Sequence, residues 1–196
     1  MLFGEKYDII RVSIKFLIMK HISLAHMSYD EAMESFRRII RNDSWVQCII
    51  DFPADFSMSK IIRDMIGELF DHYSISKKWR GRFILIIDEL INNSIEHGSK
   101  KGDENTCKIE AGNNKEGHFF IRFEVHDTGN GTGDCSEAQN NVDKAKKEAE
   151  KNKKLYMNKR GRGLFLITKK LVDSLDFSKS EKGGMAVKIE KTIYDT

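Results

Sequence analysis

The sequence predicts a domain of the α+β class, built from interspersed α-helices and β-strands. Apolar residues recur at helical spacing along residues 57–70, and they alternate with polar residues along 118–126. Turn-forming residues at 112–117 join the second of these runs to an earlier strand-like run. With 196 residues, of which 40% are hydrophobic, the chain can bury the core of one domain.

The composition of the chain argues against several classes of protein. Charged residues make up 32% of the sequence but the net charge is only +3, which gives no indication of nucleic-acid binding. The longest apolar stretch near the N-terminus, Phe16–Met19, is too short for a membrane span or a signal peptide. Cys48, Cys107 and Cys135 fit no disulfide framework and no CxxC metal pattern, so we expect a protein of the reducing cytoplasm.

The N-terminal part of the chain predicts a strand followed by a helix. Residues 8–19 mostly alternate between apolar and polar side chains, as in a half-buried strand. Ser28 and Glu31 have the spacing of a capping box that opens the helix. We expect residues 1–44 to form an N-terminal extension and residues 45–196 to form the main domain.

The main domain is expected to open with a strand and an amphipathic helix. Trp45 to Phe52 is a strand candidate that ends at Pro53. Ser57 or Ser59 is the expected N-cap of the following helix. The apolar face of that helix consists of Met58, Ile61, Ile62, Met65, Ile66, Leu69 and Phe70.

The stretch that ends at His97 predicts another helix, one face of which is polar. Glu89, Asn93 and His97 follow one another at four-residue intervals, so they line up along the helix. Gly98 stands where a helix C-terminus favours a residue that tolerates a positive φ. Taken alone, this polar face is either the floor of a binding site or the solvated surface of a core helix.

Strands and two glycine-containing turns follow this helix. Strands at 106–111 and 118–126 lead into the turn Asp127-x-Gly129-x-Gly131. Residues 134–160 are highly charged and predict a solvated, mobile segment.

The second glycine turn, Gly161-Arg162-Gly163, precedes a predicted helix marked by Leu164, Ile167, Leu171 and Leu175. The free N–H groups of a helix N-terminus can hold an anion, although the same glycines fit an ordinary loop. A strand near 175–178, a turn at 182–184 and a last strand at 185–193 complete the chain.

In this order, the motifs resemble those of the GHKL ATPases, which include gyrase, histidine-kinase catalytic domains and the anti-sigma-factor serine kinases. The resemblance covers residues 45–193, and His97-Gly98 is most similar to the anti-sigma kinase branch. The matching motifs are Glu89-x3-Asn93-x3-His97, Val125-x-Asp127-x-Gly129-x-Gly131, Gly161-x-Gly163-Leu164 and Gly183-Gly184.

The resemblance implies a two-layer α+β sandwich with a mixed, largely antiparallel sheet, helices on one face and an ATP lid at about residues 132–160. It also implies ATP and Mg²⁺ as cofactors. Glu89 would then be the catalytic base, and Asn93 would give a carboxamide oxygen to Mg²⁺. Asp127 would accept a hydrogen bond from the adenine amino group.

The other motif residues would surround the same nucleotide. Gly129 and Gly131 would let the backbone pass close to the base. His97 would contact the nucleotide or serve only to cap the helix. The candidates for phosphate contact are Lys159, Arg160, Gly161, Arg162 and Gly163, and Leu164 and Gly184 are further candidates for nucleotide binding. The chain departs from the family pattern at Met185, where a threonine is usual, and at Thr132, where an aliphatic residue is usual.

The resemblance therefore implies a serine/threonine protein kinase of the anti-sigma type, which phosphorylates a small antagonist protein and regulates transcription through partner switching. The expected partners are an antagonist-like protein, a sigma factor and a second copy of the chain in a homodimer, with neither nucleic acid nor membrane. The alternative is a non-catalytic interaction module of the same fold, in which ATP controls protein binding. Transfer of the γ-phosphate to a protein separates these two hypotheses.

Overall fold

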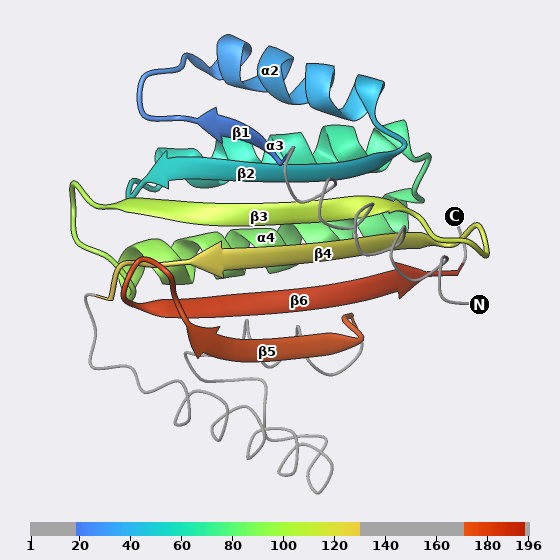
Figure 1. The fold of residues 1–196 in the computed structure, drawn as a ribbon. Coiled ribbons are helices and arrows are strands. Elements are labelled where there is room, and N and C mark those ends of the chain that lie inside the picture. Colours follow the sequence, from blue (N-terminus) through green and yellow to red (C-terminus); the bar gives the residue numbers. More distant parts are fainter. Residues whose placement is uncertain (1–18, 130–170, 195–196) are drawn as a thin grey trace, which may run out of the picture.

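The computed structural model describes residues 19–129 and 171–194, and within them the chain forms one six-stranded sheet with three helices. The elements are β1 (Lys20–Ser23), α2 (Tyr29–Asn42), β2 (Trp45–Pro53), α3 (Ser57–His72), α4 (Lys77–Glu96), β3 (Glu104–Asn113), β4 (Phe119–His126), β5 (Ser174–Lys179) and β6 (Met185–Ile193). The strand order is β1-β2-β3-β4-β6-β5. β1 and β2 are parallel, and the other neighbours are antiparallel. The predicted sandwich with helices on one face is therefore confirmed (Figure 1).

The start of α2 follows from the predicted capping box. The Ser28 hydroxyl accepts a hydrogen bond from the backbone N–H of Glu31 (3.3 Å), and the Glu31 carboxylate accepts one from the backbone N–H of Ser28 (2.8 Å). Each side chain satisfies an N–H group that lacks a partner within the helix. This local signal was read correctly from the sequence.

The start of α3 differs from the expectation. Phe56 occupies the N-cap position, and neither Ser57 nor Ser59 caps the helix with its side chain. Asp55 instead accepts hydrogen bonds from the backbone N–H and the hydroxyl of Ser57, at 2.8 and 2.6 Å. Ser59 donates its hydroxyl to Asn92 on α4, at 2.5 Å. The Asp55 carboxylate therefore stabilises the N-terminus of α3, a role that the sequence predicted for a serine side chain.

The later elements agree closely with the predicted ones. The strand expected at 185–193 is β6, and the strand expected at 118–126 is β4 apart from its first residue. Leu175 lies in β5 and so belongs to a strand, not to the helix that begins at Leu164 in the sequence pattern. Leu171 lies in a turn before β5, and the preceding part of that predicted helix, at 164–170, lies outside the described residues.

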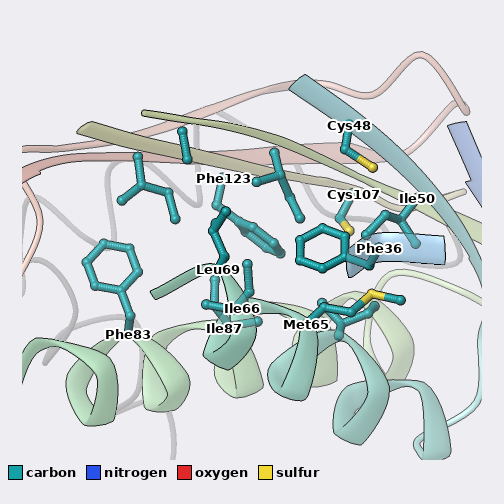
Figure 2. Packing of buried hydrophobic residues seen from close by; sticks show 14 of the residues in the cluster. Phe36, Cys48, Ile50, Met65, Ile66, Leu69, Phe83, Ile87, Cys107 and Phe123 are labelled. Atoms are coloured by element: carbon teal, nitrogen blue, oxygen red, sulfur yellow. The ribbon is translucent and has the colours of Figure 1, made fainter. Parts of the chain in front are cut away.

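The core lies between the sheet and the helices, as Figure 2 shows for side chains from both layers. Phe36 of α2, Met65 of α3 and Phe83 of α4 meet apolar side chains of the central strands there. Cys48 and Cys107 are buried in this core, and burial raises the pKa of the Cys48 thiol to about 12. Both cysteines are therefore small, unreactive core residues.

The described part of the N-terminal segment joins the same sheet and core. β1 pairs with β2, and Phe36 of α2 is fully buried. The strand predicted at 8–19 lies almost wholly outside the described residues, and the boundary at residue 44 stays a prediction. No helix in the described parts of the chain is long and apolar enough to cross a membrane.

Candidate functional site

Helix α4 presents the predicted polar face at half-buried positions. Ile87 and Ile91 on its apolar face belong to the core and are fully buried. Glu89 and Asn93 lie one turn apart at the edge of that face, where each is half-buried. The Asn93 amide nitrogen donates a hydrogen bond to the Glu89 carboxylate, at 3.3 Å. This bond occupies the amide nitrogen and leaves the Asn93 amide oxygen for another ligand.

His97 stands at the end of this row and differs from the other two residues. It is the C-cap residue of α4, and its backbone N–H donates to the carbonyl of Asn93, at 3.0 Å. Its imidazole is 69% exposed. The backbone of His97 therefore has a capping role, whereas its side chain is available to solvent or to a ligand.

Gly98 brings the end of α4 against the end of β4. Its φ is not in the left-handed region, so the conformational reason expected for a glycine here is wrong. A Cβ at Gly98 would lie 2.2 Å from the Asp127 Oδ2 atom. The Gly98 carbonyl also accepts a hydrogen bond from the backbone N–H of Gly129, at 2.8 Å. Glycine is needed at this position because Asp127 occupies the space of a side chain.

Asp127 is held by the backbone around it. Its side chain is buried, and Oδ1 accepts hydrogen bonds from the N–H groups of Met185 (2.8 Å) and Gly129 (3.1 Å). The Asp127 N–H donates in turn to the Met185 carbonyl, at 3.0 Å. Met185 thus fixes Asp127 through its main chain, and this contribution does not depend on the threonine that is usual at its position.

Two further glycines close the space around this carboxylate. Gly129 has a φ of +85°, which favours glycine. A Cβ at Gly184 would lie 1.9 Å from Asp127 Oδ1, and a Cβ at Gly129 would lie 2.9 Å from the Cα of Gly184. We call Gly98, Gly129 and Gly184 the glycine cradle of Asp127. Backbone therefore approaches the carboxylate from three separate segments of the chain.

The cradle leaves one oxygen of Asp127 open to a donor. Within residues 19–129 and 171–194, the hydrogen bonds to the Asp127 side chain all reach Oδ1. Burial raises the pKa of the Asp127 carboxyl above its ordinary value, although the N–H groups of Met185 and Gly129 act to lower it. A buried carboxylate with an unused acceptor atom is stabilised by a ligand that donates a hydrogen bond.

Lys182 anchors the glycine turn that carries Gly184, although no sequence motif identifies it as a site residue. Its amine lies 3.3 Å from the Asp51 carboxylate on β2 and 3.1 Å from the Glu104 carboxylate on β3. Within the turn, the backbone N–H of Ser180 donates to the Gly184 carbonyl, at 2.8 Å. The turn is therefore tied both to itself and to two other strands of the sheet.

Several of the predicted site residues lie outside the described residues. They are Gly131, Lys159, Arg160, Gly161, Arg162, Gly163 and Leu164, together with the proposed lid at 132–160. The structure brings together the remaining group, in which the end of α4 meets the end of β4 and the turn before β6. The polar face of α4 thus adjoins the Asp127 cradle.

A family model for the histidine kinase-like ATPase domain matches residues 52–191. The chain belongs to this family. The match runs from Phe52 in β2 to Lys191 in β6, so the whole candidate site lies inside the histidine kinase-like ATPase domain. No curated protein matches the chain.

Membership of the histidine kinase-like ATPases gives the cradle a ligand class, because these are ATP-binding domains. The residues present fit an adenine nucleotide. Asp127 offers an acceptor atom that none of the hydrogen bonds within the described residues uses, and the three glycines let the backbone close around its carboxylate. Sequence reasoning identified Asp127 and two of the cradle glycines, Gly129 and Gly184, as site residues, but it did not foresee that Gly98 is shaped by the Asp127 carboxylate.

Proposed function

We propose that this histidine kinase-like ATPase domain is a serine/threonine protein kinase of the anti-sigma-factor type. The observation that carries the proposal is the buried Asp127 with its unused Oδ2 atom, next to the helix that presents Glu89 and Asn93. A carboxylate accepts a hydrogen bond from the exocyclic amino group of adenine. Guanine has a carbonyl oxygen at the same place on its ring, and that oxygen would repel the carboxylate.

Asn93 has the chemistry of a ligand for Mg²⁺. Its amide oxygen is a hard, neutral donor, and the hydrogen bond to Glu89 does not use it. Among the described residues no group of three or more His, Cys, Asp or Glu side chains could hold a metal ion. A Mg²⁺ site here would therefore consist of Asn93, phosphate oxygens and water, and the ion would offset the phosphate charge.

Glu89 has the chemistry of a general base. Its carboxylate is half-buried and lies one helical turn before Asn93. In the proposed reaction, Glu89 accepts the proton of a serine or threonine hydroxyl on the protein substrate. The hydroxyl oxygen forms a bond to the γ-phosphorus of ATP, and the bond from that phosphorus to the bridging oxygen of ADP breaks.

The proposed protein substrate is a small antagonist of an anti-sigma factor, and release of a sigma factor would be the regulatory output. A homodimer, a cytoplasmic location and the absence of nucleic-acid or membrane partners belong to the same proposal. The second candidate is a nucleotide-dependent interaction module without phosphoryl transfer. Met185 favours this candidate, because its side chain has no hydroxyl to offer a phosphate group.

Calorimetry with Mg-ATP and Mg-GTP tests the proposal first. We expect micromolar to submillimolar binding of ATP and much weaker binding of GTP. Asp127→Asn should weaken ATP binding by about 1–3 kcal/mol, the usual cost of a mismatched buried polar group. Equal binding of ATP and GTP by the wild-type protein would contradict the adenine assignment. Transfer of labelled γ-phosphate to candidate antagonist proteins then separates the kinase from the non-catalytic module.

A further inference from the structure

A chain of polar side chains runs behind the candidate site, between α4 and the turn after β4. Four of them are linked in the order Ser94, Asn105, Ser99 and Thr128, the last link being made by the backbone N–H of Thr128, and the Thr128 hydroxyl bonds to Asp103. We call these five residues the polar relay. Ser94, Ser99 and Asn105 are buried, and Asn105 has no exposed surface. None of the five is a defined residue of the sequence motifs, although Ser94 and Thr128 occupy unspecified positions within them.

The hydrogen bonds of the relay follow a consistent direction. The Thr128 hydroxyl donates to the Asp103 carboxylate (2.6 Å), and the Ser99 hydroxyl donates to the Asn105 amide oxygen (2.6 Å). The Asn105 amide nitrogen donates to the Ser94 hydroxyl at 3.3 Å.

The ends of the relay are fixed to backbone. The Ser94 hydroxyl donates to the Ile91 carbonyl (2.8 Å), and the backbone N–H of Lys100 donates to Asp103 (2.9 Å). Because the Thr128 hydroxyl gives its single proton to Asp103, the backbone N–H of Thr128 makes the link to the Ser99 hydroxyl, at 3.4 Å. Both ends of the relay are thus held by backbone groups.

Burial makes such a network costly unless its members are bonded. An amide as deeply buried as that of Asn105 is tolerated only with partners, and apolar side chains of similar size would fill the space at less cost. Stability alone therefore does not explain the relay. Its position offers another explanation, because two of its members are chain neighbours of candidate ligands. Ser94 follows Asn93, and Thr128 follows Asp127.

We propose that the polar relay is a positioning device that sets the adenine-binding carboxylate of Asp127 relative to the metal- and phosphate-binding face of α4. Asn105 and Thr128 are then positioning residues, which touch neither the base nor the phosphates. This inference rests on the proposed ATP site. It adds residues that determine how sharply that site recognises the amino group of adenine.

The test compares two nucleotides that differ only in that amino group. ATP and purine riboside triphosphate are titrated in the presence of Mg²⁺, and the ratio of their dissociation constants measures recognition by Asp127. Thr128→Val keeps the shape of the side chain and removes its hydroxyl, whereas Asn105→Ala interrupts the relay at its centre. Each should lower the preference for ATP by about 3- to 10-fold, in line with the loss of one hydrogen bond.

Two controls separate positioning from general stability. Thr128→Ser retains a hydroxyl and should restore the preference for ATP. Thr192→Val makes the same change on β6, far from the relay, and should leave the preference unchanged. If Thr128→Val and Asn105→Ala lower only the melting temperature and keep the wild-type preference, the relay is purely structural and the inference is wrong.

The outcome for the wild-type protein distinguishes this failure from failure of the proposed function. A wild-type protein that binds neither nucleotide, or binds both equally, has no adenine recognition for the relay to position. Both proposals would then fall. If the wild-type protein prefers ATP and both relay variants keep that preference, only the inference about the relay is wrong, and the proposed function stands.

Discussion

Asp127 and Glu89 are both carboxylates of the candidate site, but the protein surrounds them in different ways. Asp127 is buried, accepts two backbone hydrogen bonds and lies against the backbone of three glycines. Glu89 is half-buried and accepts a hydrogen bond from the amide of Asn93, at 3.3 Å. The first group is fixed by main chain, and the second is oriented by another side chain.

This difference matches the roles that we propose for the two groups. Recognition of a base requires an acceptor in a fixed place, and backbone donors provide that with little loss of entropy on binding. Proton transfer requires a carboxylate that an incoming hydroxyl can reach, so some exposure is necessary. The comparison predicts that changes at the Asp127 end alter affinity, whereas changes at Glu89 alter chemistry.

The largest effect is expected from Glu89→Gln. The glutamine keeps an acceptor for Asn93 but cannot take up a proton, so phosphoryl transfer should fall by about 10²- to 10⁴-fold. ATP binding should stay within a few-fold of the wild type. Calorimetry and a transfer assay on the same preparation measure both quantities.

Asn93→Ala is the contrasting variant. It should remove the Mg²⁺-dependent part of ATP binding, because the amide oxygen is lost. If Glu89→Gln and Asn93→Ala weaken binding to the same extent, the polar face of α4 has only a structural role. The proposed difference between Asp127 as a fixed binding group and Glu89 as a reactive group would then be wrong.

Gly184→Ala should disrupt the glycine cradle of Asp127 at the other end of the site. The new Cβ would lie 1.9 Å from Asp127 Oδ1 and 2.2 Å from the Gly129 nitrogen, so the carboxylate or the turn must move. Overpacking of this kind typically costs about 1–3 kcal/mol, and we expect ATP affinity to fall by about 10- to 100-fold. Calorimetry at a temperature where the variant is folded checks this. Unchanged affinity would show that the cradle is not part of the nucleotide site.

The sequence predicted those features that depend on near neighbours in the chain. The capping box of Ser28 and Glu31 acts across three residues, and the alternating pattern of β4 is contained within one strand. The order of the glycine motifs also predicted Asp127 as a site residue, because the resemblance to the family rests on several motifs together and not on a single turn. Composition and periodicity alone left the polar face of α4 open to two interpretations.

The sequence could not predict features that depend on contacts between distant segments. Gly98 was explained by its own φ, but its reason is the Asp127 carboxylate, which lies on another element. Ser59 was expected to cap α3, but its hydroxyl bonds to Asn92 on α4. The relay residue Asn105 begins a strand and shows no pattern of its own. Each of these roles depends on a residue that is distant in the sequence and that the fold brings into contact.

The pH dependence of ATP binding offers a more moderate test of the Asp127 end. Burial raises the pKa of Asp127 above its ordinary value of 3.8, and only the ionised form accepts a hydrogen bond on both oxygens. ATP affinity should therefore fall on acidification, beginning at a higher pH than for an exposed aspartate. Asp127→Asn should remove this component, which is measured as the difference between the two pH profiles.

The same group has the opposite effect on the stability of the free protein. Between the ordinary and the raised pKa, the folded state holds more protons on Asp127 than the unfolded state does. The contribution of Asp127 to stability therefore decreases as the pH rises through that window. An Asp127→Asn variant whose ATP affinity follows the wild-type pH profile would show that another group controls binding.

The smallest effect is expected from Gly81→Ala, which makes the same substitution in α4 where there is space for it. No atom lies within 4 Å of a Cβ built on Gly81, so the methyl group meets no obstacle. Alanine in a helix interior is more favourable than glycine by about 0.5–1 kcal/mol, because the unfolded chain loses less entropy on folding. Urea unfolding should show that gain, and ATP affinity should not change. A loss of stability, or a change in affinity as large as that of Gly184→Ala, would mean that glycines matter in this domain for flexibility and not for the space that they leave to Asp127.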